Sequence, residues 1–170
     1  LTRLEQSFDL LRSTRRDLPQ RHMSLRVSIE SSWDLLTPSE RAAIAGCSVF
    51  CGGFGLEAAE AVLERAPDAP AMLDLLSALR DKSMLRALES PSGEIRFRLY
   101  ESVRELAREK LSASGRSDAV EAAHAAWFLA EAERRACGAF GSDAEACLAW
   151  LAAELDNVIS VAERERERQP

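Results

Sequence analysis

Side chains able to perform acid–base or nucleophilic chemistry are few in this sequence, and they lie far apart. The two histidines, His22 and His124, fall in opposite halves of the 170 residues. A catalytic base needs a nucleophile and an orienting group within hydrogen-bond reach. Since His22 precedes a predicted helix and His124 lies inside an apolar-faced one, each is expected to be a hydrogen-bonded structural residue.

The cysteines could in principle bind a metal or form disulfides. Their positions are Cys47, Cys51, Cys137 and Cys147. They lack paired C-x-x-C spacing, and a tetrahedral zinc site would require two remote segments to meet. They are also too sparse for the disulfide framework of a small secreted domain. The expectation is therefore four small buried thiols in a reducing compartment, with no metal site.

A glycine-rich run, Cys51-Gly52-Gly53-Phe54-Gly55, could suggest phosphate binding. It contains no lysine and follows no strong strand, whereas a phosphate loop has the pattern G-x-x-x-x-G-K-[ST]. The sequence also contains no G-x-G-x-x-G, G-x-S-x-G or H-E-x-x-H motif. The run is predicted to be a tight structural turn, and the chain is predicted not to be an enzyme.

Charged residues are abundant and mixed in sign. The sequence has 28 acidic residues against 22 Lys and Arg, a formal net charge of -6. Such a chain repels nucleic-acid phosphates unless its basic residues gather on one face. Glu131 with Glu133, and the alternating Glu and Arg of residues 163–168, are predicted to be solvated helix faces with i,i+4 pairing rather than catalytic carboxylates.

The overall composition is that of a soluble globular protein, with 46% hydrophobic and 29% charged residues. The apolar stretch of residues 42–54 is interrupted by glycine and is shorter than a membrane span of ~18 residues. Residues 1–5 include an acid and no signal-peptide core. The chain is therefore expected to be cytoplasmic, with no membrane partner.

The first half of the chain shows helical periodicity. Apolar residues spaced as on a helix predict helices over residues 3–13 and 24–36, joined by a polar linker that ends at Gln20. Thr37-Pro38-Ser39-Glu40 has the pattern of a capping box with proline at the first helical position, so a helix is predicted to begin there. Further helices are predicted over Leu56 to about Arg65, where Pro67 stops the pattern, and over residues 71–82.

The periodicity then changes from helix to strand. Residues 84–88 and 95–99 flank a turn-like segment, and the second run alternates apolar residues with arginine, as a half-exposed strand does. The result is a predicted β-hairpin directly after several short helices, the arrangement of a winged helix in which the hairpin is the wing.

Helical patterns return after the hairpin. A helix near residues 103–111 is closed by Gly115, and two long helices, 117–138 and 143–168, are separated by a short loop that makes them antiparallel neighbours. The predicted fold is mainly α: a winged-helix domain with one β-hairpin, followed by an antiparallel helical hairpin. The predicted division is the end of a preceding helical domain with its linker (1–20), the winged helix (21–114) and the helical hairpin (115–170).

A winged helix that binds DNA needs Lys and Arg on the helix that enters the major groove. The candidate, residues 71–82, carries two acids against Arg80 and Lys82. The wing and the following helix are more basic, but glutamates interleave their arginines. This mixture favours a salt-bridged protein contact, with Arg96, Arg98 and Arg104 as candidate interdomain residues. A DNA-binding winged helix remains the alternative.

Several short runs, in this order, resemble a known family: RHMSLR (21–26), SWDLL (32–36), SVFCGGF (48–54), LEAAEAV (56–62), DKS (81–83), RLYESVRE (98–105) and ELDN (154–157). Together they resemble the region after the nucleotide-binding domain in bacterial STAND-class (NB-ARC-like) ATPases, which include large transcriptional regulators. The resemblance implies a winged helix that packs on the nucleotide-binding domain and holds it closed around ADP, followed by tetratricopeptide-like sensor repeats.

The same resemblance implies partners and a candidate site. The partners would be the protein's own nucleotide-binding and helical sensor domains, with self-association as a further expectation. ADP or ATP would bind upstream of Leu1, and no cofactor is expected in this chain. In NB-ARC relatives a Met-His-Asp motif touches the nucleotide, and Leu99, Tyr100 and Glu101 match it position for position. Tyr100 departs from the pattern by replacing an imidazole, so two roles stay open for it: a nucleotide contact, or packing against the wing.

Overall fold

The structure is a computed structural model that describes residues 24–90, 93–136 and 144–168. Contacts divide the chain into two compact units, with the boundary between Leu36 and Thr37. In the first unit, the described residues form a helix over residues 24–34 followed by a bend. The helix predicted over 24–36 is thus confirmed and ends two residues early. The helix and linker predicted within residues 3–20 lie outside the described residues.

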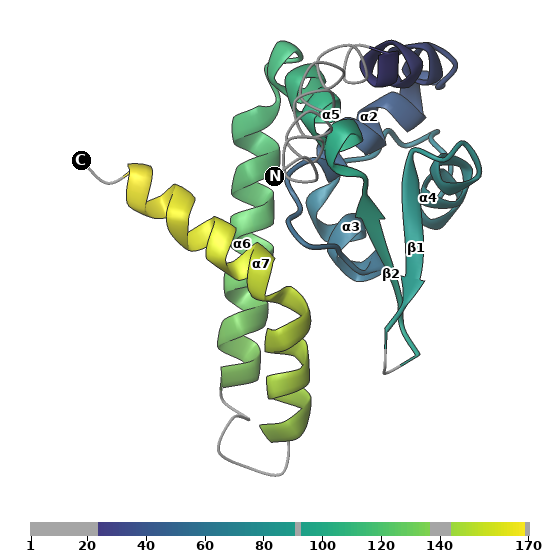
Figure 1. The fold of residues 1–170 in the computed structure, drawn as a ribbon. Coiled ribbons are helices and arrows are strands. Elements are labelled where there is room, and N and C mark those ends of the chain that lie inside the picture. The colour runs from purple at the N-terminus through teal and green to yellow at the C-terminus, as the bar shows by residue number, and fades with distance from the viewer. Residues whose placement is uncertain (1–23, 91–92, 137–143, 169–170) are drawn as a thin grey trace, which may run out of the picture. The chain divides into compact units, whose positions relative to one another are not determined.

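The second unit is mainly helical and contains one β-hairpin, which confirms the predicted fold class (Figure 1). Among the described residues of this unit, three helices precede the hairpin and three follow it, in the order expected for a winged helix followed by a helical hairpin. The elements are α2 (Pro38–Cys47), α3 (Leu56–Val62), α4 (Met72–Asp81), β1 (Leu85–Glu89), β2 (Ile95–Leu99), α5 (Glu101–Ala113), α6 (Ser117–Ala136) and α7 (Ala144–Arg168).

Helix α2 begins with the predicted capping box. The Glu40 amide donates to Thr37 Oγ1 at 3.3 Å, and the Thr37 amide donates to Glu40 Oε2 at 2.7 Å. Lys82, just after α4, donates to both carboxylate oxygens of Glu40 at 2.7 and 2.6 Å. Burial alone would raise the pKa of Glu40, but the bonds from Lys82 and Thr37 and the Lys82 charge lower it. The cap therefore also ties the start of α2 to the end of α4.

Helix α3 is shorter than predicted. It ends at Val62, and Leu63 adopts an extended conformation with φ -97° and ψ 110°. The Leu63 side chain packs directly over Gly46 of α2, where a Cβ atom would lie 2.5 Å from Leu63 Cδ2. The prediction to about Arg65 was wrong because this contact directs the chain out of the helix before Pro67 can stop it.

The wing is a regular antiparallel hairpin whose register pairs Leu85 with Leu99 and Glu89 with Ile95. Phe54 adds an isolated bridge on the other side of β2: its amide donates to the Phe97 carbonyl at 2.9 Å, and the Phe97 amide donates back at 2.8 Å. The glycine-rich turn is therefore attached directly to the wing.

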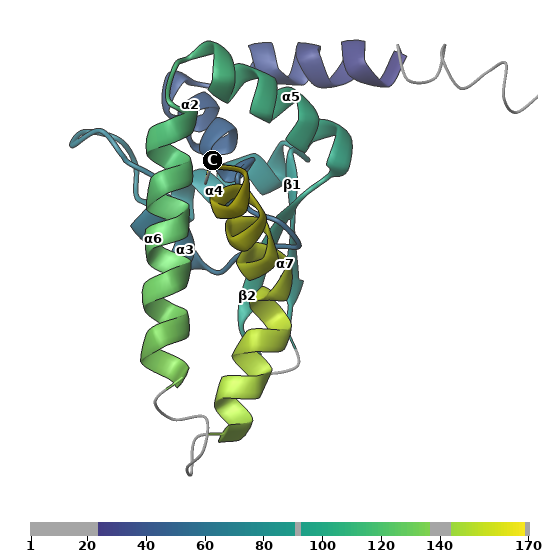
Figure 2. The same cartoon turned by 90° about the vertical axis from the view of Figure 1, so that its left-hand side faces the viewer.

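Helices α6 and α7 lie side by side and run antiparallel (Figures 1 and 2). Val120, His124 and Phe128 are buried at four-residue spacing on α6, while Glu154, Asn157 and Val161 are buried on α7. The predicted helical hairpin is confirmed in its two helices, and its loop lies outside the described residues. Within the described part of the chain, no helix is both long and apolar enough to cross a bilayer.

Candidate functional site

The glycine-rich turn is where the winged helix meets the helical hairpin. Gly52 has φ 77° and Gly53 has φ 135°, backbone conformations that favour glycine. A Cβ atom on Gly52 would lie 2.3 Å from Asp156 Oδ2, so α7 approaches the bare backbone of the turn closely. The predicted tight structural turn is confirmed, and its glycines allow a helix to pack against it.

Asn157 of α7 holds this turn through its side-chain amide, which is fully buried. Its Oδ1 accepts from the Cys51 amide at 2.7 Å, and its Nδ2 donates to the Gly53 carbonyl at 2.8 Å and to Glu154 Oε2 at 2.8 Å. Both ends of the amide are used, so only an asparagine side chain in this orientation fits all three partners.

Arg96, on strand β2 of the wing, also contacts the glycine-rich turn and α7. Its Nη1 donates to Glu154 Oε1 at 2.6 Å, and its Nη2 donates to the carbonyls of Gly53 at 3.3 Å and Ala153 at 3.1 Å. The side chain of Glu154 is 4% exposed and that of Arg96 is 18% exposed. Because Glu154 is buried and its second carboxylate oxygen is held by Asn157, loss of Arg96 would leave a poorly compensated charge.

His124 of α6 completes the network as a structural residue, as predicted. Arg164 Nη2 donates to His124 Nδ1 at 2.9 Å, so Nδ1 is the acceptor and Nε2 carries the proton, which points to Asn157 Oδ1 at 3.4 Å. Burial, aided by the Arg164 charge, lowers the pKa of His124 to about 4. The imidazole is therefore neutral at pH 7. His22 lies outside the described residues.

Aromatic rings surround the polar groups. Phe50, at the start of the turn, stacks on Phe54 with centroids 4.3 Å apart and meets the His124 ring at 5.2 Å. His124 in turn lies 4.6 Å from Phe128. Buried hydrogen bonds fix geometry more strictly than apolar contacts do, although Arg164 Nη1 has no partner among the described residues. We call the set Cys51, Gly53, Arg96, His124, Glu154, Asn157 and Arg164 the polar junction.

A pocket of about 330 Å³ lies beside the polar junction, between α7, the glycine-rich turn and the segment joining β2 to α5. It collects four of the six predicted site residues, Arg98, Leu99, Glu101 and Arg104. Arg104 Nη2 pairs with Glu101 at 2.7 Å. The hydrogen bond from Arg104, together with the charges of nearby arginines, lowers the pKa of Glu101.

Tyr100 does not line this pocket. It is the residue before α5, it is 44% exposed, and its hydroxyl caps nothing in the helix. The guanidinium carbon of Arg86, on strand β1, lies 5.9 Å from the centre of its ring. This contact at cation–π range favours packing against the wing as one role of Tyr100, and it leaves the hydroxyl free to meet another molecule.

The cysteines differ from the expectation of four buried thiols. Cys47 is buried, and burial raises its pKa. Cys51 and Cys147 are only half-buried, because they lie at the edge of the pocket and on the partly exposed helix α7. Cys137 lies outside the described residues. No group of three or more potential metal ligands occurs in the described ranges.

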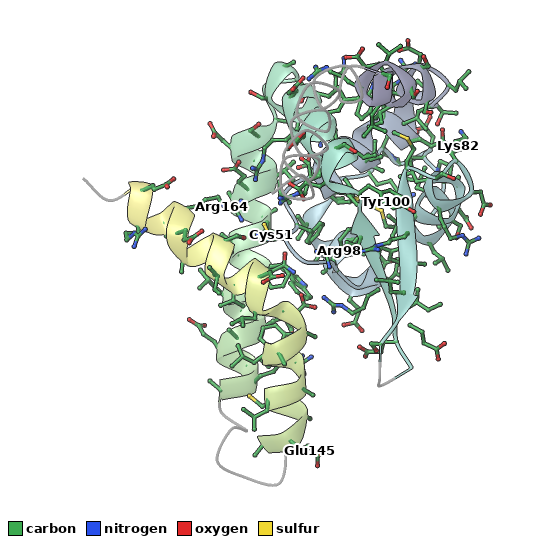
Figure 3. The ribbon with its side chains drawn as sticks, viewed as in Figure 1. Cys51, Lys82, Arg98, Tyr100, Glu145 and Arg164 are labelled. Atoms are coloured by element: carbon green, nitrogen blue, oxygen red, sulfur yellow. The ribbon has the colours of Figure 1, made fainter. Side chains whose placement is uncertain are left out.

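Helix α4 is the candidate for entering a DNA groove under the DNA-binding alternative, and the basic residues at its end are paired with carboxylates. Arg80 bonds Asp81 through two nitrogens, at 3.1 and 2.8 Å, and Lys82 is held by Glu40. Figure 3 shows Lys82, which follows α4, away from Arg98 and Cys51, which lie on the side of the winged helix towards α7.

Of the polar junction, the sequence predicted only Arg96 as a contact residue and His124 as a structural residue, without the partners of either. Glu154 and Asn157 belong to one of the runs that carry the family resemblance. A signal was present: Glu154 and Asn157 share a helical face with Val161, so two polar groups occupy a stripe that should be apolar. Buried polar positions of this kind need partners.

Comparison with known proteins finds similar segments in mycobacteria. Two proteins, from Mycobacterium bovis and Mycobacterium tuberculosis, each bear the name "Putative HTH-type transcriptional regulator" and are 37% identical over 156 residues. The match covers 91% of this chain and 17% of each relative. An uncharacterised protein of Mycobacterium bovis is 34% identical over 122 residues, which is 71% of this chain and 31% of that protein. No family model matches, and no solved structure matches significantly. The chain is thus similar to one segment of much longer proteins.

Proposed function

We propose that this chain is a non-catalytic interaction segment of a larger transcriptional regulator, in which the winged helix and the helical hairpin move as one body. Two mycobacterial relatives that match 91% of the chain are named as regulators of the helix-turn-helix type. The observation that carries the proposal is the buried Arg96–Glu154 pair, at 2.6 Å, which joins the wing to α7. Through this pair, a displacement of the wing would also displace α7.

The finer proposal concerns the docking partner. By the resemblance to STAND-class ATPases, the winged helix docks on the protein's own nucleotide-binding domain, where ADP or ATP is held, and the hairpin leads into a helical sensor. The start of α5 suits such a contact, since Tyr100 is exposed there beside the charged pair Glu101 and Arg104. The mechanism is a docking equilibrium that nucleotide exchange or a sensor ligand biases through differential affinity.

Charge supports docking on protein rather than on DNA. Both cations of the α4 region, Arg80 and Lys82, are engaged by carboxylates, and Arg96 of the wing is paired with Glu154. Phosphate contacts would have to compete with these pairs. If the proposed function is right, we expect a titration of labelled duplex DNA at low salt to show only weak binding. The DNA-binding alternative predicts tight binding whose affinity falls steeply with salt concentration. In Arg98→Gln, the slope of the logarithm of the binding constant against the logarithm of salt concentration would then be smaller by about one.

The coupling is tested in the full-length protein by the rate of ADP release. Arg96→Met removes the guanidinium that joins wing and hairpin, and we expect faster release because the docked arrangement is loosened. Arg108→Met is the matched control, since Arg108 is an exposed arginine of α5 outside the junction. Equal release rates for the wild type and Arg96→Met would contradict the coupling.

The role of Tyr100 is tested by a pair of substitutions in the same assay. Tyr100→Phe keeps the ring that meets Arg86 and removes the hydroxyl, whereas Tyr100→Ala removes both. If the hydroxyl contacts the nucleotide, both variants lose ADP faster. If Tyr100 only packs on the wing, Tyr100→Phe behaves as the wild type does.

A further inference from the structure

The pocket beside the polar junction has walls of opposite charge. One wall comes from the end of β2 and the start of α5, with Arg98 and the Arg104–Glu101 pair. The other comes from α7, with Asp156, Ser160 and Glu163. In Figure 3, Arg98 and Cys51 lie between α7 and the strands of the wing. The two walls therefore belong to the two elements that the junction joins.

The charges on these walls are only partly compensated within the described part of the chain. Arg104 is paired with Glu101, and the charge of Arg98 also acts on Glu101. The described residues provide no ion pair for Asp156 or Glu163 on the opposite wall. Asp156 lies against the bare backbone of Gly52, which leaves no side chain between its carboxylate and the turn. Unpaired charges that line a common pocket favour a guest with the opposite charge at each end.

The charged residues on both walls of the pocket disfavour ligands that carry only a positive or only a negative charge. An anion placed at Arg98 would be repelled by Asp156, Glu163 and Glu101, and a cation placed at the α7 wall would meet Arg98 and Arg104. The volume of about 330 Å³ is at the small end of the range for ligand pockets, ~300–1,000 Å³. The pocket thus suits a small polar molecule that carries both charges.

We propose that this pocket binds a small zwitterion of the α-amino-acid class, with its carboxylate at Arg98 and its ammonium group at Asp156 and Glu163. Such a ligand bridges the wing and α7 next to Asn157, so its binding stabilises the junction. This site goes beyond the proposed function, because it requires no nucleotide-binding domain and can be tested on the 170-residue chain itself.

The first experiment measures thermal unfolding of the chain with each proteinogenic L-α-amino acid at millimolar concentration. Saturating ligand raises Tm by several degrees through mass action, and we expect this from at least one amino acid. The matched probes are its N-acetyl derivative, which lacks the ammonium group, and its amide, which lacks the carboxylate. Absence of a shift with every amino acid would overturn the proposal, and so would an equal shift with either blocked derivative.

The second experiment places the ligand in the pocket by calorimetric titration of the amino acid that gives the largest shift. Arg98→Gln and Asp156→Asn should each weaken binding at least tenfold, because each removes one of the two opposed charges. Glu145→Gln, on α7 at the far end of the hairpin (Figure 3), should bind as the wild type does.

Folding of the variants is checked by circular dichroism and by Tm without ligand. Arg98 is exposed and its side chain has no ion pair among the described residues, so its replacement leaves the fold intact. Wild-type affinity in Arg98→Gln would place the ligand elsewhere and overturn the proposal. The ADP-release rate of the full-length Arg96→Met variant is a separate measurement, so failure of this site is distinguishable from failure of the proposed function.

Discussion

The winged-helix core and the polar junction are both buried, but they are held together by different interactions. The core is built from fully buried apolar side chains such as Ile44, Leu76 and Leu79. The junction contains His124, Asn157 and Glu154, which are equally buried but polar and hydrogen-bonded. Apolar packing is non-directional and tolerates swaps of similar volume. A satisfied buried network accepts only the groups that complete it.

The apolar core and the hydrogen-bonded junction have different structural roles. The core determines that the winged helix folds, and the junction determines where α7 sits on it, since each of its bonds has a defined donor and acceptor. Substitutions that preserve shape should therefore spare the core and damage the junction.

Asn157→Asp keeps the shape of the side chain and reverses the polarity of one end. The new carboxylate oxygen would face the Gly53 carbonyl and Glu154, both acceptors, inside a buried site. We expect a loss of about 3–5 kcal/mol in the free energy of unfolding, as when a buried charge loses its partner. Urea denaturation followed by circular dichroism measures it, and a loss below 1 kcal/mol would show that the junction tolerates polarity changes.

Leu76→Ala in α4 creates a cavity in the apolar core, where Leu76 is fully buried. A loss of about 2–5 kcal/mol is expected from lost transfer energy and the remaining cavity. The control, Leu76→Met, preserves volume and should cost less than about 1.5 kcal/mol. If Leu76→Met were as damaging as Asn157→Asp, the contrast between core and junction would not hold.

Acidification should weaken the junction through His124. Its pKa is lowered to about 4 in the folded chain, against about 6.5 when unfolded, so the unfolded state binds more protons between these values. Stability is therefore fully present above pH 6.5 and falls as the pH drops towards 4, by roughly 2 kcal/mol between pH 7.5 and 5. Unfolding free energies at several pH values measure this slope. The unfolding free energy should depend less on pH in His124→Asn. An unchanged dependence would mean that other titratable groups cause it.

Thr37→Ala removes the hydroxyl that caps α2 and leaves both the core and the junction intact. The expected loss is about 1 kcal/mol, because the Glu40 amide loses its acceptor while the bond from Lys82 to Glu40 remains. Thr37→Ser keeps the acceptor and is the matched control. A loss as large as that of Leu76→Ala would mean that the cap organises more of the fold than α2.

Most elements of the fold could be predicted because their signals are local. The capping box at Thr37, the alternation in residues 95–99 and the glycine at 115 each specify backbone geometry within a few residues. The end of α3 could not be predicted in this way. It depends on Leu63 packing over Gly46, a contact between residues of two different helices.

The structure gives the positions of the predicted site residues, and their predicted roles stay predictions. Four of the six predicted residues line the pocket, and Arg96 contacts the helical hairpin. The roles of Leu99, Tyr100 and Glu101 at a nucleotide stay predictions. The partners of Arg96 lie more than forty positions away in the sequence, and no local pattern encodes which distant carboxylate an arginine meets.

By itself, the sequence determined a mainly helical chain with a wing and a tight glycine turn, because helix caps, strand alternation and turn residues act over a few bonds. Only the tertiary structure decided that Asn157 would hold this turn, that Glu154 would pair with Arg96, and that opposed charges would line one pocket. Such long-range pairs depend on how whole elements dock, and docking is governed by burial and by the need to satisfy every buried polar group.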